Sequence, residues 1–346
     1  MTVTSPVNAV IFGLEGPKLR SGEAAFFRDC NPFGFILFSR NVETPEQVKK
    51  LCGDLRTTVG RNALIFVDQE GGRVQRLGPP HWRKATYAYD FGELYSHNTQ
   101  NALRAIWLNF RLIAEELRTV GITANCAPVL DLPVFGADPI ISDRAFSRHP
   151  DAMIDMAQAC ISGLAAGGVA SVIKHIPGHG RATVDSHKAL PVIGEPIAEL
   201  SKTDFLPFKA LNAAPMAMTA HVILKQINAK NPVTVSRIAF EKIIRGELGY
   251  DGLVMSDDLD MKALKGDLTD LTRDCLGAGC DIVLQCNGNL ANMVKVAKGL
   301  EALTGDSLRR AKLAETATEG YEEFDLEAGL DEYTAIMTQL GNLVAG

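Results

Sequence analysis

The sequence predicts a closed barrel of eight parallel strands surrounded by helices, the TIM-like (β/α)8 arrangement. Eight short apolar runs recur along the 346-residue chain, and most are separated by segments long enough for a helix. Because the runs are continuously apolar, each should be buried on both faces, as in a parallel sheet covered by helices. Polar residues follow many of the runs, which favours a barrel with one site at its mouth. An open doubly wound sheet is the alternative, but no G-x-G-x-x-G motif follows the first run.

The expected strands and helices alternate through the chain. In order, the strands cover 7–14, 33–38, 63–67, 122–129, 169–173, 215–220, 252–255 and 280–284. The clearest helix signal is Thr44, which precedes Pro45 at the first helical position and Gln47 at the capping-box position. Other helices are expected at 103–120, 152–166, 203–211, 237–248 and 268–276 and from 290 onward. The aperiodic segment 78–100 is interpreted as an excursion over the barrel mouth.

The length and composition fit one globular domain. Barrels of this class reach this length as a single unit, and 46% hydrophobic residues supply an ample core. We expect residues 1–346 to form one catalytic domain, with the helices of roughly 290–346 packed on the barrel.

Charge and cysteine usage argue against several classes of protein. The net charge is −6, and no basic block indicates binding to nucleic acid or a membrane surface. The first residues lack the charged start of a signal peptide, and their apolar run is too short for an anchor. Seven cysteines without a C-x-x-C pair fit buried, reduced thiols. We expect a cytoplasmic protein without nucleic-acid or membrane partners, and a monomer, although no heptad repeat or exposed apolar stripe decides the oligomeric state.

The most informative stretch is 174–190, KHIPGHGRATVDSHKAL, which follows the fifth expected strand. Its proline and glycines require a loop, and this loop holds three of the seven histidines. Titratable groups on a loop at the carboxyl end of a barrel strand are typical of a catalytic mouth. A solvated loop and a metal site are the alternatives. The metal site is disfavoured because no His-x-x-x-His pair lies on a helical face and no cysteine is near.

A second group of carboxylates follows the seventh expected strand. Asp257 comes directly after that strand, which can fix its carboxylate and aim it into the barrel mouth. Its neighbours Asp258 and Asp260 are interpreted as caps or solvated loop residues.

Asp185 and His187 form a candidate acid–base pair. One residue separates them, so that in an extended or turn segment their side chains point to the same side. A paired carboxylate favours the imidazolium and raises the histidine pKa, which leaves the ring able to donate a proton near neutral pH. A purely structural His–Asp contact is the alternative.

Further polar candidates lie at strand ends and in loops. Lys174 and His175 are adjacent, so both reach the mouth only if the strand breaks there, which the following Ile-Pro step makes plausible. Asp68, Arg76 and Arg144 are the remaining candidates, although a loop arginine taken alone more often belongs to a surface ion pair.

Taken together, several sequence blocks resemble bacterial β-N-acetylglucosaminidases of glycoside hydrolase family 3. The blocks are VDQEGGRVQRL, SDRAF, IKHIPGHG with the later DSH, MTAHV and RGELGYDGLVMSDDLDM. They run from Asp68 to Met261 and so cover nearly the whole barrel. The KH-x-PGHG and DSH loop is the most specific block, because it marks the N-acetylglucosaminidase branch rather than the β-glucosidase branch.

The resemblance implies a retaining hydrolase, and we expect neither a cofactor nor a metal. Asp257 matches the family nucleophile, and His187, supported by Asp185, matches an unusual histidine acid/base. The positions that match the family's contacts to the terminal sugar are Asp68, Arg76, Arg144, Lys174 and His175.

The family and the expected compartment imply a role in cell-wall recycling, with cleavage of N-acetylglucosamine from anhydro-muropeptides. A family 3 β-glucosidase and a catalytically silent sugar-binding protein are alternatives. An N-acetylglucosaminide phosphorylase is another, because a neutral imidazole repels phosphate less than a carboxylate would. One departure from the family is Arg181, where many relatives carry a small or acidic residue. We expect this arginine to alter only the surface charge of the loop.

Overall fold

Eight parallel strands form a closed barrel in the computed structural model, which describes residues 6–345, with side chains through residue 339. Each strand pairs in parallel with its neighbours in the order β1, β12, β11, β9, β7, β6, β3 and β2. Their bounds are β1 Asn8–Gly13, β2 Pro32–Leu37, β3 Leu64–Val67, β6 Ala124–Asn125, β7 Ala170–Ile176, β9 Met216–Thr219, β11 Leu253–Asp258 and β12 Ile282–Gln285. Every expected strand overlaps one of these eight, so the predicted TIM-like (β/α)8 fold is confirmed.

The fourth barrel strand is much shorter than the sequence indicated. Regular pairing is confined to β6, whereas the prediction covered 122–129. Pro128 has no N–H to donate to a strand ladder, and beyond it Val129 makes a single parallel bridge with Lys174. The prediction of a strand over all of 122–129 was therefore wrong, although the segment still leads to Asp131 at the carboxyl end of the barrel.

Two separate two-stranded sheets lie outside the barrel. Strands β4 (Gln69–Gly71) and β5 (Val74–Gln75) form an antiparallel hairpin directly after β3. Its turn needs glycine, since Gly72 has φ +57° and a Cβ there would lie 2.2 Å from the Tyr87 ring. Strands β8 (Val192–Ile193) and β10 (Ile223–Leu224) pair in parallel.

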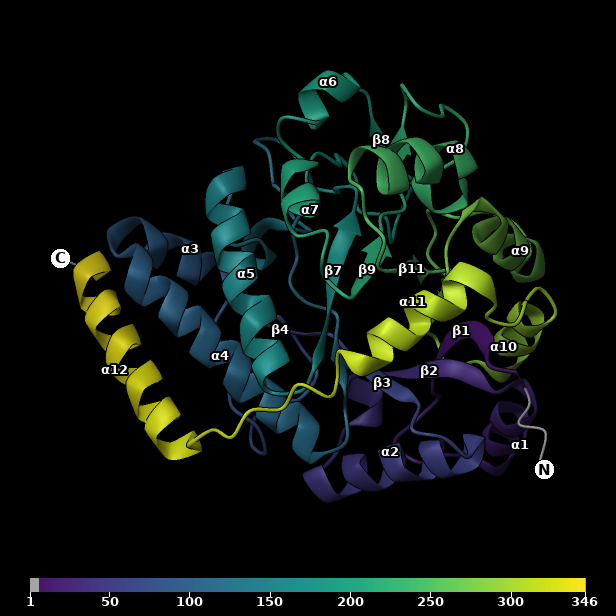
Figure 1. Ribbon diagram of the computed structural model, residues 1–346, viewed down its shortest axis with the longest axis horizontal. Helices are drawn as coiled ribbons and strands as arrows, with labels where there is room; N and C mark the ends of the chain where they lie inside the picture. The colour runs from purple at the N-terminus through teal and green to yellow at the C-terminus, as the bar shows by residue number, and fades with distance from the viewer. Residues whose placement is uncertain (1–5, 346) are drawn as a thin grey trace.

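Helices surround the barrel. Figure 1 shows α4 and α5 side by side on one flank of the strands and α9 and α10 on the other, while α11 crosses in front of the strands. Their bounds are α1 Ser21–Cys30, α2 Pro45–Val59, α3 Ala88–His97, α4 Thr99–Thr119, α5 Pro150–Ala166, α6 Ile197–Leu200, α7 Leu206–Ala210, α8 Arg237–Ala239, α9 Leu268–Ala278, α10 Leu290–Ala297, α11 Gly305–Thr316 and α12 Leu326–Ala345. A π-helical segment, Phe240–Glu247, continues α8, and 3-10 turns cover Ser39–Asn41, Ser142–Arg144 and Val233–Val235.

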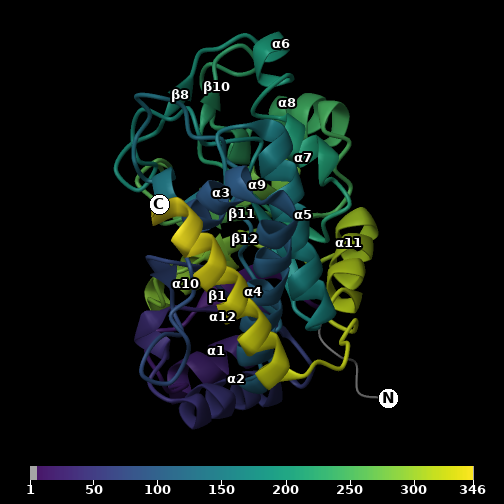
Figure 2. The same cartoon turned by 90° about the vertical axis from the view of Figure 1, so that its left-hand side faces the viewer.

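The segment 78–100 departs from its prediction. It contains helix α3, which packs against α4 and α12 on the outside of the barrel (Figure 2). Phe91 is fully buried there, with its ring 6.4 Å from that of Phe146. None of residues 78–100 lines the cavity at the mouth. The interpretation as an excursion over the mouth is wrong, because these apolar side chains are buried against other helices instead.

The last helices pack on the barrel through a buried arginine. The Arg111 side chain, in α4, is only 1% exposed and pairs with Glu115 at 3.0 Å. Its guanidinium donates to the backbone oxygen of Glu322 at 2.8 Å and lies 4.6 Å from the Phe324 ring centroid. The connection between α11 and α12 is therefore fixed to α4.

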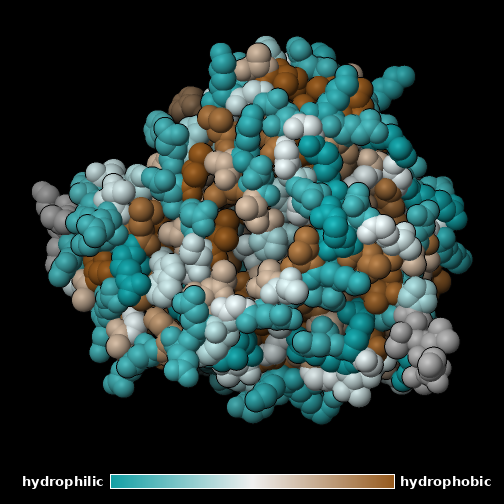
Figure 3. Space-filling view, viewed as in Figure 1, coloured by the Kyte–Doolittle hydropathy of each residue, from teal (hydrophilic) through white to brown (hydrophobic). Residues whose placement is uncertain are grey.

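Apolar side chains alternate between two layers of the core. In β1, Ile11 points into the barrel, whereas Val10 and Phe12 pack against the helices outside. On the face shown in Figure 3, hydrophobic side chains lie in scattered patches among hydrophilic ones. All seven cysteines are free thiols, and six of them are buried. Within residues 6–345, none of the helices combines the length and apolar character that crossing a membrane requires.

Candidate active site

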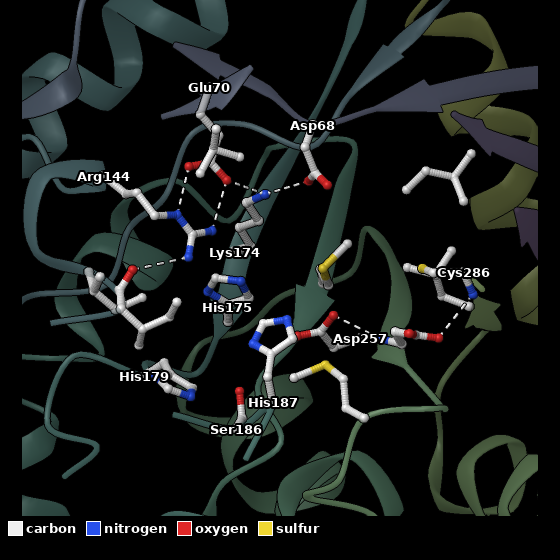
Figure 4. A pocket seen from close by; sticks show the side chains of 18 of the residues that line it. Asp68, Glu70, Arg144, Lys174, His175, His179, Ser186, His187, Asp257 and Cys286 are labelled. Carbon is white, nitrogen blue, oxygen red and sulfur yellow. Dashed lines mark hydrogen bonds and ion pairs between the residues drawn. The ribbon is translucent and has the colours of Figure 1, made fainter. Parts of the chain in front are cut away.

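A cavity of about 220 Å³ lies at the carboxyl ends of the barrel strands (Figure 4). The structure brings seven of the eight predicted site residues to its lining: Asp68, Arg76, Arg144, Lys174, His175, His187 and Asp257. The eighth, Asp185, does not line the cavity but contacts His187. Residues that are more than 180 positions apart in the sequence thus converge on one site.

One side of the cavity is a chain of alternating charges, which we call the charged wall. Lys174 Nζ lies between two carboxylates, 2.8 Å from Asp68 Oδ1 and 2.6 Å from Glu70 Oε1. Arg76 closes one end by donating to Asp68 Oδ2 at 3.0 Å. Arg144 closes the other with two hydrogen bonds of 2.8 Å to Glu70. Each buried charge of the wall has an opposite charge beside it, as burial requires.

The charged wall keeps its members ionised. Burial alone would raise the pKa of both carboxyl groups. The cations overcome this effect and lower the pKa of Glu70 to about 2 and that of Asp68 well below its usual range. Burial would likewise lower the pKa of Lys174, but Asp68 and Glu70 hold it above the usual value. The wall therefore presents fixed charges to the cavity across the physiological pH range.

Glu70 was missed in the sequence. It stands two residues after Asp68, directly beyond β3, and residues two apart in an extended segment point to the same side. That spacing was the available signal. The two carboxylates share Lys174, so its ammonium group lies between two negative charges.

Lys174 and His175 both reach the cavity, as the break in the strand suggested. The pairing of β7 with β9 shifts register between Lys174 and Ile176. His175 Nδ1 contacts Asp131 Oδ2 at 2.6 Å, and Asp131 Oδ1 accepts the backbone N–H of His179 at 2.6 Å. Asp131 is fully buried, so it orients the His175 ring from behind the cavity.

Asp257 lies at the end of β11, and backbone groups fix its position. Its N–H donates to Thr219 Oγ1 at 3.3 Å, and its Oδ1 accepts the N–H of Asp258 at 2.8 Å. Its carboxylate lines the cavity on the side opposite the charged wall (Figure 4).

The neighbouring carboxylates are not solvated loop residues. Asp258 also lines the cavity, and its Oδ1 accepts the N–H groups of Cys286 at 2.9 Å and Asp260 at 3.3 Å. The interpretation as a cap is correct for the contact with Asp260 only. Burial raises the pKa of Asp258 to about 7, although the Cys286 N–H opposes the shift. Asp260 accepts from Gln285 at 2.7 Å.

The predicted pair of Asp185 and His187 forms in the loop after β7. Asp185 Oδ1 accepts the backbone N–H of His187 at 2.9 Å and lies 2.9 Å from its Nδ1. Burial would raise the pKa of Asp185, but the contacts with His187 lower it, so the carboxylate is charged. The His187 side chain is 62% exposed, which leaves its Nε2 open to the cavity and to solvent.

His179 and His221 are buried, unlike the exposed His187. His221 is fully buried, with Nδ1 2.7 Å from Thr234 Oγ1 and Nε2 3.0 Å from the backbone oxygen of Asp258. Both of its nitrogens are therefore occupied. Burial lowers the pKa of His179 to about 4, so that ring is neutral, and neither of its nitrogens has a partner among the described residues. Neither histidine is placed to exchange protons as His187 is.

Comparison with known proteins identifies the family. The profile of the glycosyl hydrolase family 3 N terminal domain matches residues 12–316. The chain belongs to glycosyl hydrolase family 3. The resemblance seen in the sequence blocks is thus confirmed, and the chain is a glycoside hydrolase by family.

Individual family 3 relatives cover most of the chain. A β-hexosaminidase of Thiobacillus denitrificans is 39% identical over 258 residues, which span 73% of this chain and 71% of its own. A β-hexosaminidase of Xanthomonas euvesicatoria pv. vesicatoria is 35% identical over 327 residues, 93% of this chain and 95% of its own. The structure of NagZ from Neisseria gonorrhoeae in complex with N-trifluoroacetyl-D-glucosamine superposes with a TM-score of 0.85 at 31% identity, and the match covers 96% of this chain and 98% of that one.

The family 3 site shows no arrangement for a metal ion. Across the described part of the chain, no group of three or more His, Cys, Asp or Glu side chains could hold one. The charged wall instead pairs its carboxylates with Lys and Arg. What the site offers chemically is a carboxylate on a strand end, an imidazole on a loop, and fixed hydrogen-bond donors in the charged wall.

Proposed function

We propose that this family 3 enzyme is a retaining exo-β-N-acetylglucosaminidase that removes terminal β-linked N-acetylglucosamine. The observation that carries the proposal is that Asp257 and the Asp185–His187 pair meet at one cavity although they come from different elements. Retaining hydrolysis needs a nucleophile on one face of the sugar and a proton donor on the other. The relatives called β-hexosaminidase supply the substrate class.

The proposed reaction has two steps. Asp257 attacks the anomeric carbon while His187, as imidazolium, gives its proton to the leaving oxygen, so that the glycosidic bond breaks and a glycosyl-enzyme forms. His187, now neutral, then takes a proton from water, and the resulting hydroxide oxygen displaces Asp257 and releases the sugar. Asp185 stabilises the imidazolium and holds the ring through Nδ1, which leaves Nε2 for both proton transfers.

The charged wall is assigned to the terminal sugar. Asp68, Arg76, Arg144, Lys174 and His175 would hold its hydroxyl and acetamido groups with charge-assisted hydrogen bonds. Because the ions already neutralise one another, the wall offers these contacts without an unpaired charge in the empty site. It also closes one side of the cavity, which favours removal of a terminal residue over internal cleavage.

We further propose N-acetylglucosamine-terminated anhydro-muropeptides as the natural substrates, within cell-wall recycling in the cytoplasm. Residues 1–346 would act as a single-domain monomer, since all groups of the mechanism come from one chain. No second domain is needed to supply the acid, because His187 already lies beside the nucleophile's cavity.

The test is release of p-nitrophenol from the N-acetyl-β-glucosaminide and from the β-glucoside, with and without phosphate. We expect turnover of the first substrate only, with β-N-acetylglucosamine as the initial product. Faster turnover of the glucoside would make the chain a β-glucosidase, and a sugar phosphate product would make it a phosphorylase. No turnover of either, together with sugar binding, would leave a sugar-binding protein.

A further inference from the structure

Arg181 lies in the loop that joins β7 to β8, six residues before His187. Its side chain is only 14% exposed, so the expectation that it alters merely the surface charge of the loop is wrong. Its guanidinium reaches outward from the loop to the segment that contains α6 and precedes α7.

The guanidinium of Arg181 contacts three acidic residues and one hydroxyl. Its Nε lies 2.7 Å from Asp204 Oδ2, and Asp204 is itself only 4% exposed. Its Nη1 lies 3.1 Å from Glu199 and 3.5 Å from Glu195, and its Nη2 donates to Thr203 Oγ1 at 3.2 Å. Burial alone would lower the pKa of Arg181, but the hydrogen bond to Asp204 and the charges of the three carboxylates raise it above the usual value. The guanidinium of Arg181 therefore stays charged at every working pH.

The Asp185–His187 pair has no comparable contact with the rest of the protein. Among the described residues, both side chains form polar contacts only within their own loop: with each other, and between Asp185 and Lys188 at 3.7 Å. The backbone of the loop is bonded to other segments at four positions: His179 N donates to Asp131 Oδ1 at 2.6 Å, Gly180 O and Ala182 O accept from Val134 N at 3.2 Å and Asp138 N at 2.8 Å, and Ser186 O accepts from Ala263 N at 3.2 Å. The position of His187 therefore depends on how the loop backbone is fixed.

Arg181 supplies all the ion pairs that join residues 177–190 to another segment, within the part of the chain that the structure describes. The backbone bonds at 179, 180 and 182 fix the first part of the loop, and the ion pair of the largely buried Arg181 with the buried Asp204 joins this part to the segment before α7 in a geometry with few alternatives. Three residues separate Arg181 from Asp185: the buried Ala182 and the exposed Thr183 and Val184.

We infer that Arg181 is a positioning residue, whose ion pairs with Asp204, Glu199 and Glu195 hold the 177–190 loop so that His187 faces the reacting bond. The inference rests on the proposed role of His187 as acid and base. Arg181 touches neither the substrate cavity nor the reacting atoms, and it acts only through the geometry of the Asp185–His187 pair.

The main test compares Arg181→Met with Arg104→Met. Arg104 forms a bidentate pair with Glu332 at 2.7 and 2.6 Å on the outside of the barrel, and it serves as the matched control. Rates are measured with aryl N-acetylglucosaminides that span a range of leaving-group acidity. Arg181→Met should lower kcat about 10- to 100-fold for the poorest leaving groups and little for the best, with KM nearly unchanged. Arg104→Met should leave the whole series unchanged.

Two further variants separate positioning from stability. Arg181→Met leaves the buried Asp204 carboxylate without its cation, so the double variant with Asp204→Asn removes both charges and provides a chain that should fold. The double variant should show the same pattern as Arg181→Met, with a large rate loss for poor leaving groups and little for good ones. Arg181→Lys keeps a charge but not the fork of donors, and its rates should fall between those of wild type and Arg181→Met. An equal rate loss for all leaving groups in these variants would indicate a structural role and overturn the inference.

Hydrogen exchange provides a readout that does not depend on catalysis. The amides of Lys188 and Ala189 donate to Asp185 O at 2.8 and 3.0 Å, and they should exchange faster in Arg181→Met than in wild type or Arg104→Met. Unchanged exchange overturns the inference even if the proposed function stands. A different result would count against the proposed function itself. If exchange is faster in Arg181→Met but the rate loss of His187→Ala does not depend on the leaving group, His187 is not the acid, and the positioning role of Arg181 fails with that assignment.

Discussion

The charged wall and the 177–190 loop face the same cavity but are held in opposite ways. In the wall, the Lys174 and Glu70 side chains are 2% and 5% exposed, and each ion is fixed by partners from other elements. In the loop, the His187 side chain is 62% exposed, and its one polar partner among the described residues lies two positions away. The wall combines strand ends with the turn that holds Arg144, whereas His187 belongs to a glycine-rich connection.

The difference matches the two proposed tasks of sugar binding and proton transfer. Groups that hold a sugar gain by being preorganised, since no rearrangement is then needed on binding. A group that must serve first a leaving oxygen and then water needs access to solvent and room to adjust. Removing a residue from each region should therefore have a different signature.

The largest effect is expected for Asp257→Ala. Loss of the proposed covalent nucleophile should lower kcat on the order of 10⁴-fold. The fold should survive, because the side chain is at a strand end and lines the cavity rather than the core. Steady-state rates and far-UV circular dichroism test both parts. Full activity of Asp257→Ala with an inactive Asp258→Ala would move the role to the neighbouring carboxyl group.

The next largest effect is expected for His187→Ala, and it should depend on the leaving group. For alkyl glycosides we expect a loss of roughly 10²- to 10⁴-fold, whereas substrates with acidic leaving groups should lose much less in the first step. Asp185→Asn should move the limb of the pH–rate profile that reports the acid to lower pH, because the imidazolium loses its charged partner. A loss that is equal across all leaving groups would remove His187 from the role of proton donor.

Glu70→Gln should reveal how strongly the charged wall is coupled. The change removes one carboxylate from between Lys174 and Arg144, and breaking a buried pair of this kind lowers the free energy of unfolding by about 3–5 kcal/mol. The control is Asp143→Asn, which removes the exposed pair with Arg73 and should lower it by less than about 1 kcal/mol. Urea denaturation measures both, and equal effects would show that the wall is no more coupled than the surface.

A smaller effect concerns Asp258 and pH. Its pKa is about 7 in the folded chain and near 3.8 when unfolded, so the folded state binds the extra proton between these values. The free energy of unfolding should therefore fall as the pH rises from about 4 to about 7. Asp258→Asn should not show this fall in the free energy of unfolding. The Tm of the variant minus that of wild type should therefore increase as the pH rises over the same range. A Tm difference that does not change with pH, as expected for the control Asp260→Asn, would contradict the prediction.

Chelation should have no effect on activity. The wall pairs its carboxylates with Lys and Arg, and the histidine of the loop is assigned to proton transfer. Activity measured after dialysis against EDTA should equal that of untreated protein. A loss that is restored by added zinc would overturn the assignment of the loop.

The barrel was predictable from the sequence because its signals are local. Continuous apolar runs marked each strand, and Thr44 caps α2 as expected, with Oγ1 accepting from Gln47 N at 3.2 Å. The length of β6 was overestimated because the expected strand was continued through Asn125 and past Pro128, although the missing N–H of Pro128 was a visible signal for its end. Helix α3 was missed because its apolar face, with Phe91 and Leu94, is interrupted by polar and aromatic residues.

Partners across the site were harder to predict. Residue types and strand ends identified Asp68, Lys174 and Asp257, but nothing local indicated that Glu70 and Arg144, 74 residues apart, share two hydrogen bonds. The role of Arg181 was hidden for the same reason, as Asp204 lies 23 residues further along the chain. Which charges are buried depends on the folded neighbours rather than on the residue alone.

Arg111 has a consequence for where the chain can be shortened. The family match ends at residue 316, which would suggest that the remainder is a removable tail. Yet the oxygen of Glu322 and the ring of Phe324 cover a guanidinium that is almost completely excluded from water. A protein cut at residue 320 would open this charge and the neighbouring face of α4 to solvent. We expect such a fragment to be insoluble, so any expression boundary belongs beyond Phe324.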